Sequence, residues 1–352
     1  MVFSHVRPSE KSLVAELPAM LARLLAIPQK AVTLRRGTNA DLFVKAADHA
    51  FAVKVLVHAS PGALVAHSAQ VSEAARRYGR KVVPLMAVPH MTEAGRRVCQ
   101  DAGISWFDFS GNAHIVAPGL RIIVDGCPNR FRGPGRPSSI FAPKSARVVR
   151  WLLINEGRAL TQRDIARATD MTEGFVSRIV SRLQSETYIV RETGGAIRVK
   201  DPQVLLEAWR DEYRFDQHLI LQGHVAARSG AALTRFVSEN LAAASVEHAA
   251  TGLAAAWQMM HFVGFRIASF FLAEPPAPEL QAKLGFREDE RGANLWLVIP
   301  KDEGVFQGSG TRDGVRCVHP VQAYVDLKAH PERSTEAAEG LRSELLRWRH
   351  DG

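Results

Sequence analysis

From residue 145 to residue 199, apolar positions recur at the spacing of helices and then at the spacing of strands. Three short helices are predicted, each with one apolar face, and two strands follow them. The apolar positions are Val148, Val149, Leu152 and Leu153 in the first helix, Ile165 and Ala166 in the second, and Val176, Ile179, Val180 and Leu183 in the third. These residues are the candidate core of a small domain.

Polar residues at the ends of these segments support the same division. Thr161 is placed to cap the second helix, a turn over residues 170–171 follows, and Thr172 is placed to cap the third helix. The strands, Tyr188–Glu192 and Ala196–Val199, are joined by Thr193-Gly194-Gly195, which suits the tip of a hairpin. Three helices and a hairpin in this order predict a winged helix-turn-helix.

A winged helix binds DNA with its third helix in the major groove, so the solvent side of that helix is the candidate reading surface. Arg178 and Ser177 are expected to contact bases, because arginine can bond guanine through two hydrogen bonds. The remaining arginines are expected to contact phosphates. The full candidate set is Thr161, Gln162, Thr172, Glu173, Ser177, Arg178, Ser181, Arg182, Arg191 and Arg198. Winged helices also serve as protein-binding modules, so the pattern alone leaves that alternative open.

The first 127 residues predict a different domain, in which helices and strands alternate. The pattern predicts helices over 10–26, 61–78 and 92–102, and strands over 31–34, 40–46, 51–57, 82–88 and 105–109. Pro18 interrupts the first helix, which is either kinked there or begins afresh at that point. The order αβββαβαβ indicates a mixed sheet with helices on its faces.

An acidic residue on a strand of this domain, Asp41, precedes a hairpin that ends in Lys54 and is followed by a helix. This is the outline of a PD-(D/E)XK nuclease, which needs a second carboxylate to hold a divalent metal. The position two before Lys54 is Ala52, so we expect a degenerate, nuclease-like fold without cleavage. Asp108 and Asn112 follow at the end of a later strand, where they could line a cleft or serve as turn residues.

Residues 126–138, GCPNRFRGPGRPS, break all periodicity with glycine and proline and form the clearest linker in the chain. Arg130, Arg132 and Arg136 make this linker basic. The RGPGRP run resembles a loose form of the AT-hook core, in which an extended Gly-Arg-Pro places arginine in a narrow minor groove. The linker is therefore either a solvated connection or an arm that contacts DNA beside the winged helix.

The formal net charge of +9 is unevenly distributed along the chain. Residues 128–200 hold 14 Lys and Arg against 6 Asp and Glu, a net charge of +8. Residues 1–127 carry +6, whereas residues 201–352 carry −5. Positive charge concentrated on a winged helix favours phosphates over an anionic membrane as the partner. Double-stranded DNA is therefore the predicted partner.

Other features exclude several classes of protein. The cysteines Cys99, Cys127 and Cys317 have neither disulfide-framework nor metal-ligand spacing, which is typical of the cytoplasm, and the N-terminus lacks the apolar core of a signal peptide. The apolar stretch 252–273 contains Arg266, so a buried helix ending near Met260 and then a buried strand are predicted in place of a membrane span. No Walker loop, GxSxG, HExxH or CxxC motif occurs. We therefore predict no enzymatic activity, no metal and no cofactor.

The C-terminal region carries more specific motifs. They are Thr251-Gly252-Leu253-Ala254-Ala255, Gly292-Ala293-Asn294-Leu295, VHPVQAYVDL over 318–327, Pro331-Glu332-Arg333 and a helix over 336–346. Together with a winged helix similar to the MarR type, these motifs resemble the AbiEi antitoxins of abortive-infection (type IV) toxin–antitoxin systems. The resemblance implies a winged helix that represses its own operon and a C-terminal domain that counters a nucleotidyltransferase toxin. The family's winged helix normally lies near the N-terminus, whereas about 140 residues precede it here.

Within VHPVQAYVDL, the polar residues Gln322, Tyr324 and Asp326 alternate with apolar ones. This alternation predicts a partly buried segment with one polar side.

These patterns together predict an α+β (mixed α/β) protein in four parts. The parts are a mixed α/β domain over 1–127, a basic linker over 128–143, a winged helix-turn-helix over 144–216 and an AbiEi-like α/β domain over 217–352. The expected function is a sequence-specific transcriptional regulator, an autorepressor and potential type IV antitoxin; the alternative is a DNA-processing nuclease, or a DNA-binding protein derived from one. We expect a homodimer, joined through the N-terminal sheet or the C-terminal domain, because winged helices commonly pair to match two half-sites.

Overall fold

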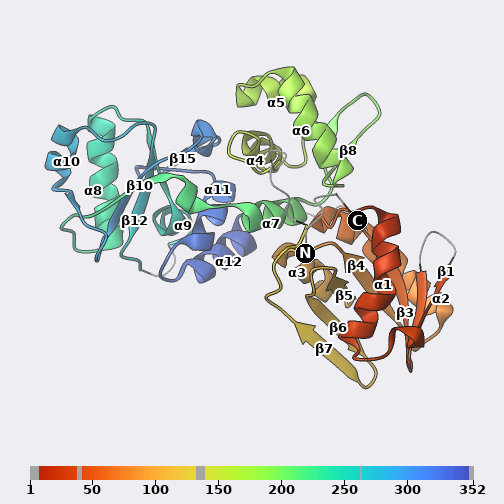
Figure 1. Ribbon diagram of the computed structural model, residues 1–352. Coiled ribbons are helices and arrows are strands. Elements are labelled where there is room, and N and C mark those ends of the chain that lie inside the picture. Colours follow the sequence, from red (N-terminus) through yellow and green to blue (C-terminus); the bar gives the residue numbers. More distant parts are fainter. Residues whose placement is uncertain (1–7, 38–41, 132–138, 262–263, 349–352) are drawn as a thin grey trace. The chain divides into compact units, whose positions relative to one another are not determined.

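A computed structural model describes residues 8–37, 42–131, 139–261 and 264–348. The chain divides into two compact units, Met1–Ser138 with Leu183–Tyr188, and Ser139–Arg182 with Ile189–Gly352. Figure 1 shows both units to be built from helices and sheets, which confirms the mixed α/β class. None of the described helices is long and apolar enough to cross a membrane.

The first unit is built on a seven-stranded mixed sheet whose strands lie in chain order. The first three strands form an antiparallel meander, the third, fourth and fifth run parallel, and the last two are antiparallel. The strands are β1 (Val32–Arg36), β2 (Leu42–Ala46), β3 (His49–Val55), β4 (Val82–Val88), β5 (Ser105–Asp108), β6 (Ala113–Ala117) and β7 (Leu120–Val124). The sequence pattern does not predict β6 and β7, because Val116 in β6 and Ile123 in β7 place apolar residues on the exposed side of each strand and break the alternation in the sequence.

Helices cover both faces of this sheet (Figure 1). On one face, α1 (Glu10–Leu24) packs Leu17 and Leu21 against Phe51 and Val53 of β3. On the other, α2 (Pro61–Tyr78) and α3 (Glu93–Asp101) form a second core around Met86. Pro18 lies inside α1, which continues through it as one helix after an N-terminal capping box made by Ser9 and Ser12. A helix that begins afresh at Pro18 is therefore excluded, because α1 is a single helix.

The winged helix opens the second unit. It consists of α4 (Ala146–Ile154), α5 (Gln162–Thr169), α6 (Glu173–Ser185), β8 (Ile189–Arg191) and β9 (Ile197–Val199), and α7 (Pro202–Glu212) follows it. Strands β8 and β9 pair antiparallel. All ten apolar residues that the sequence assigns to the core of the three helices are buried, from Val148 to Leu183. The winged helix-turn-helix is thus confirmed as a fold.

A second seven-stranded sheet, in the order β13-β10-β14-β12-β11-β16-β15, forms the rest of this unit. Its strands are β10 (Leu219–His224), β11 (His248–Thr251), β12 (Ala268–Leu272), β13 (Arg287–Glu288), β14 (Leu295–Ile299), β15 (Gly310–Arg312) and β16 (Val315–Cys317). The helices are α8 (Gly230–Ala243), α9 (Gly252–Met260), α10 (Pro278–Leu284), α11 (Pro320–Asp326) and α12 (Ser334–Glu344). Helices lie on both sides of the sheet (Figure 1), and α9 followed by β12 confirms the buried helix and strand predicted for 252–273.

The prediction for residues 318–327 is wrong in one respect. The segment forms α11 and is buried on every side from Val321 to Asp326, with no solvent-facing polar side. Gln322 and Asp326 are four residues apart, so a helix places them on one face, where the Gln322 amide donates to the Asp326 carboxylate at 2.8 Å. The alternation of polar and apolar residues misleads because partners from distant segments satisfy the buried polar groups.

Candidate nucleic-acid interface

The helix-turn-helix is held by local caps. Thr161 accepts a hydrogen bond from the Asp164 backbone, and the Asp164 side chain accepts one from the Thr161 backbone, forming a capping box at the start of α5. Asp170 ends this helix in the left-handed conformation, with φ 52° and ψ 51°. Thr172 Oγ1 then accepts from the Phe175 backbone at 3.3 Å at the start of α6. The two caps predicted from the sequence are thereby confirmed, and they set the turn between the two helices.

Helix α6 has one buried and one solvent-facing side, as the sequence predicts. Thr172, Glu173, Arg178 and Ser181 are exposed, while Ser177 and Arg182 are half-buried. The Arg178 guanidinium lies 5.4 Å from the centre of the Phe175 ring, so its aliphatic stem runs along the helix surface. This side of α6 can present arginine and hydroxyl donors to a groove. The assignment of individual side chains to bases or phosphates stays a prediction.

The hairpin that forms the wing has a glycine turn at its tip, and its strands are held by side-chain contacts. Its tip contains Gly194 and Gly195, with φ of 96° and 85°, a conformation that favours glycine. Arg198 of β9 forms an ion pair with Glu192 at 2.7 Å. With its amide oriented as an acceptor, Gln162 at the start of α5 bonds the Arg191 guanidinium of β8 at 2.7 Å. Gln162 therefore positions a wing arginine, a role that the sequence did not indicate.

Of the three linker arginines, Arg130 is the one that lies among the described residues. Arg130 pairs with Glu16 of α1, and its guanidinium lies 4.7 Å from the centre of the Phe131 ring. Arg132 and Arg136 lie outside the described residues. Arg130 is thus held within the first unit, and the DNA contact of the linker stays a prediction.

Two basic residues that sequence reasoning missed lie on α5. Arg163 is 79 % exposed and pairs with Glu173 of α6 at 3.4 Å, and Arg167 is exposed one turn later. Their spacing of four residues places them on one side of the helix that crosses the DNA backbone in helix-turn-helix proteins. This spacing is the signal that could have identified them as additional phosphate contacts.

Two other arginines of the basic region face the interior of the second unit. Arg147 of α4 donates to both carboxylate oxygens of Asp302, at 2.7 and 3.0 Å, and to Glu303 at 3.1 Å. The hydrogen bond to Asp302 raises the pKa of Arg147 against the opposing effect of burial. Arg150 is 3 % exposed and bonds Gln322 of α11. Part of the +8 charge therefore joins the winged helix to the C-terminal region and is unavailable to DNA.

Behind Arg150 lies a buried polar network centred on Asp326. The Asp326 carboxylate accepts hydrogen bonds from Tyr213 at 2.5 Å, from Gln322 at 2.8 Å and from the hydroxyl of Thr251. Burial raises the pKa of Asp326 to about 7, although these hydrogen bonds oppose the rise. Burial also lowers the pKa of Arg150 to about 10 and that of the neighbouring His218 to about 4. The network links α11, the residue that follows α7, β11 and α4, so the winged helix is docked on the C-terminal region through polar side chains.

The nuclease-like positions of the first unit lack a metal site among the described residues. Asp41 lies outside the described residues, and Lys54 is half-buried on β3. No group of three or more His, Cys, Asp or Glu side chains in the described part of the chain could hold a metal ion. The nuclease-like origin of this domain stays a prediction.

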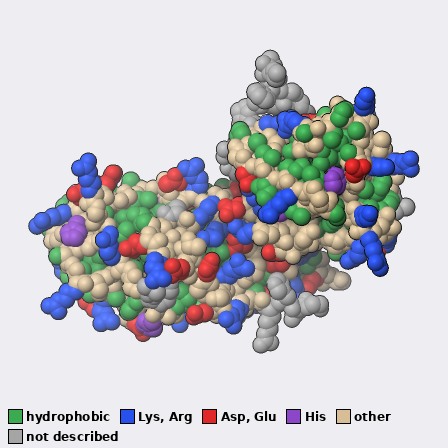
Figure 2. Space-filling view, turned by 90° about the horizontal axis from the view of Figure 1, so that it is seen from below, with side chains coloured by type: hydrophobic (Ala, Val, Ile, Leu, Met, Phe, Trp, Pro, Cys, Tyr) green, Lys and Arg blue, Asp and Glu red, His purple; other side chains and the backbone are tan. Residues whose placement is uncertain are grey.

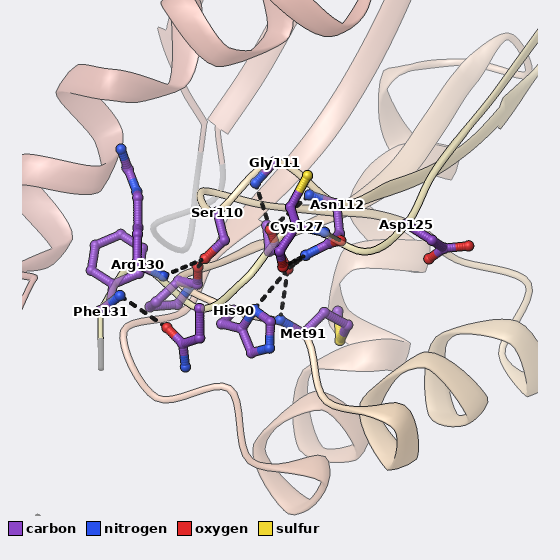
Figure 3. A network of polar contacts seen from close by, with 12 residues as sticks. His90, Met91, Ser110, Gly111, Asn112, Asp125, Cys127, Arg130 and Phe131 are labelled. Carbon is purple, nitrogen blue, oxygen red and sulfur yellow. Dashed lines mark hydrogen bonds and ion pairs between the residues drawn. The ribbon is translucent and has the colours of Figure 1, made fainter. Parts of the chain in front are cut away.

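Asp108 instead organises two loops of the first unit. Its carboxylate is fully buried and accepts from the backbones of Met91, Gly111 and Asn112 at 3.0, 2.8 and 2.9 Å. Figure 3 shows His90, Met91, Gly111 and Asn112 gathered around this carboxylate. Asn112 then bonds the Cys127 backbone through both its amide nitrogen and its oxygen. Of the two roles that the sequence allows, the structure supports the turn role.

The cysteines are free thiols. Burial raises the pKa of Cys99 and of Cys317 to about 12, which keeps both thiols protonated and unreactive near neutral pH.

Two family models match the chain. Residues 142–196 match the MarR family, and residues 198–347 match the family described as transcriptional regulator, AbiEi antitoxin, type IV TA system. No curated protein and no solved structure matches the chain. The matches cover the winged helix and the region on which it is docked, and both families consist of regulators. The chain therefore combines a winged helix similar to the MarR family with a following region similar to the AbiEi regulators, which is the domain composition of a DNA-binding transcriptional regulator.

Proposed function

We propose that this protein is an autorepressor that binds double-stranded DNA upstream of its own gene as a homodimer, in the cytoplasm and without catalysis. The observation that carries the proposal is the solvent-facing side of α6, where Arg178 and Ser181 are exposed beside a wing that holds Arg191 and Arg198. A helix of this kind enters the major groove, while a wing can contact the flanking backbone.

Each side chain has a distinct proposed task. Ser177 and Arg178 read base edges, and Thr172, Glu173 and Ser181 lie before and after them along the same helix. Arg182, Arg191 and Arg198 contact phosphates, with Thr161 and Gln162 close to the backbone at the start of α5. Arg163 and Arg167 join the phosphate contacts because α5 exposes both.

A fluorescence anisotropy titration with the DNA upstream of the gene tests this proposal. We expect the affinity to fall steeply with salt, because each phosphate contact releases a counterion. Arg178→Ala should weaken specific binding by about tenfold or more, which corresponds to the loss of one bidentate base contact. Arg333→Ala is the control, because it removes one exposed positive charge from the C-terminal region. Salt-independent binding, or equal loss in both variants, would contradict the proposal.

We further propose that the C-terminal region counters a nucleotidyltransferase toxin encoded beside this gene. The support is the family match over 198–347. The test is co-expression of the neighbouring gene with this chain and with a form carrying Arg178→Ala. Both forms should restore growth, because neutralisation by the C-terminal region does not require the DNA-reading helix. Absence of rescue by either form would contradict the antitoxin role and leave repression standing.

A further inference from the structure

The first unit ends its sheet with an unusual edge strand. In the order of strands, β7 is terminal, and its sequence from Leu120 to Val124 is LRIIV. Ile123 is 51 % exposed, and Val116 on the adjacent β6 is 49 % exposed. Figure 2 shows hydrophobic side chains at the surface of this unit. Edge strands with exposed apolar residues and no proline or bulge are templates for pairing with another strand.

The backbone groups at this edge point outward at known positions. Val116 of β6 directs its N–H and C=O toward Ser105 of β5, whose hydroxyl bonds both at 3.0 and 3.2 Å. Val116 stands opposite Arg121, so that pair exchanges no backbone hydrogen bonds across β6 and β7. The N–H and C=O of Arg121 therefore face the free edge, and by alternation those of Ile123 do as well.

The sequence of this edge is complementary to itself in the antiparallel direction. In a pairing centred on Ile123, the two copies of Ile123 face each other, and Ile122 faces Val124. Arg121 of one copy then faces Asp125 of the other, twice by symmetry. Because opposite charges on directly facing residues stabilise an antiparallel pair, this register is favoured over one centred on Ile122, in which Arg121 would face Ile123.

Changes in backbone direction mark both ends of this pairing segment. The turn at Pro118 and Gly119 begins the strand, and Gly126 leaves the extended conformation with a φ of 86°. Asp125 directly follows the last residue of β7 and is paired with Arg96 of its own chain at 2.5 Å. Its side chain is 57 % exposed, so the carboxylate retains room to accept from a second guanidinium. The pairing segment is thus Arg121–Asp125, a usual strand length.

We propose that the protein dimerises by antiparallel pairing of β7 with β7 of a second copy, centred on Ile123. The N-terminal sheets of the two copies then form one continuous sheet, and the exposed Ile123 side chains of the two copies lie side by side. This inference rests on the proposed homodimer and assigns its interface to the N-terminal unit.

The test measures the mass of the full-length protein in solution by light scattering over a range of concentrations. Arg121→Asp and Asp125→Lys each place like charges opposite one another, and each should weaken dimerisation by about tenfold or more. A mixture of the two variants should form heterodimers, because every facing pair is then of opposite sign. The double variant Arg121→Asp/Asp125→Lys should recover the homodimer. This recovery separates a lost interface from a misfolded chain.

Arg287→Asp is the matched control, because Arg287 is exposed on β13, a terminal strand of the other sheet. It should leave the dimer intact. If the Arg121→Asp and Asp125→Lys variants remain dimeric like the wild type, the β7 interface is overturned while the homodimer stands. The same conclusion follows if the mixture of the two variants stays monomeric. A wild-type chain that is monomeric at every concentration overturns both, and the anisotropy titration then decides separately on DNA binding.

Discussion

Arg150 of α4 donates two hydrogen bonds to a single oxygen, Oε1 of Gln322 in α11, at 2.9 and 2.7 Å. The guanidinium is buried and lies 5.0 Å from the centre of the Trp209 ring of α7. Its pKa of about 10 leaves it charged at neutral pH. The buried Arg150 guanidinium thus joins α4, the first helix of the winged helix, to α7 and α11.

Arg150→Ala should lower the free energy of unfolding of the second unit by about 3 kcal/mol, because it leaves a cavity and an unsatisfied Gln322 oxygen. Arg150→Lys should recover part of this loss, since one ammonium cannot reproduce the fixed fork of donors. Urea unfolding followed by tryptophan fluorescence measures the difference. The exposed Arg163 supplies the control, because Arg163→Ala should change stability by less than about 0.5 kcal/mol. Equal effects of the two alanine variants would show that the buried contact is not stabilising.

The pKa of about 7 for buried Asp326 predicts a specific pH dependence. The folded state holds this proton between pH 3.8, the ordinary value, and about 7, whereas the unfolded state has lost it. The contribution of Asp326 to stability is therefore full below the ordinary pKa and is lost as the pH rises through the folded pKa. The slope for one proton is at most about 1.4 kcal/mol per pH unit.

Comparison of the wild type with Asp326→Asn isolates this slope from the opposing effect of buried histidines such as His218, whose pKa is lowered to about 4. We expect the stability difference, wild type minus variant, to fall as the pH rises from about 4 to about 7. Urea unfolding at a series of pH values measures it. A difference that does not change with pH would show that Asp326 keeps an ordinary pKa.

Local features of the fold could be predicted from the sequence, and features that depend on distant partners could not. Thr161 and Thr172 cap their helices through residues three positions away, so short-range pattern is sufficient. Arg150 has the same charge as Arg178, and only a partner 172 residues along the chain makes it an interior residue. Gln322 and Asp326 are buried for the same reason. Net charge over a region therefore identifies a DNA-binding domain without identifying which cations face the DNA.

The candidate site follows the same division. The exposed side of α6 follows from helical periodicity, because the buried residues fix the opposite face. The contact between Gln162 and Arg191 joins α5 to the wing, and no pattern in the sequence couples these two positions. The first unit has two strands more than the predicted order, because exposed Val116 in β6 and exposed Ile123 in β7 break the alternation of apolar and polar residues.

Gly195→Ala should destabilise the wing, because Gly195 has a φ of 85° and an added Cβ meets no other atom within 4 Å. The cost is therefore backbone strain alone, about 1 kcal/mol. We expect weaker DNA binding with the overall fold retained, measured by anisotropy and circular dichroism. Gly310→Ala in β15 is the matched control, since an added Cβ there also meets open space and the position has no positive φ, so the fold and DNA binding should be preserved. If the two substitutions weaken DNA binding equally, the wing conformation is not the cause.

Asp108→Asn should destabilise the two loops that contain Met91 and residues 111–112. The new amide group presents donors to backbone N–H groups that need an acceptor. Burial, the largest effect, raises the pKa of Asp108, but hydrogen bonds from His90, Met91 and Asn112 together lower it below its ordinary value. The stabilisation is thus present above the ordinary pKa of 3.8 and is lost as the pH falls through the folded pKa. At neutral pH we expect a cost of about 3 kcal/mol, seen as faster hydrogen exchange over residues 89–112. Asp101→Asn, at an exposed position that ends α3, should leave exchange unchanged. Unchanged exchange in Asp108→Asn would mean that the surrounding backbone holds these loops without the carboxylate.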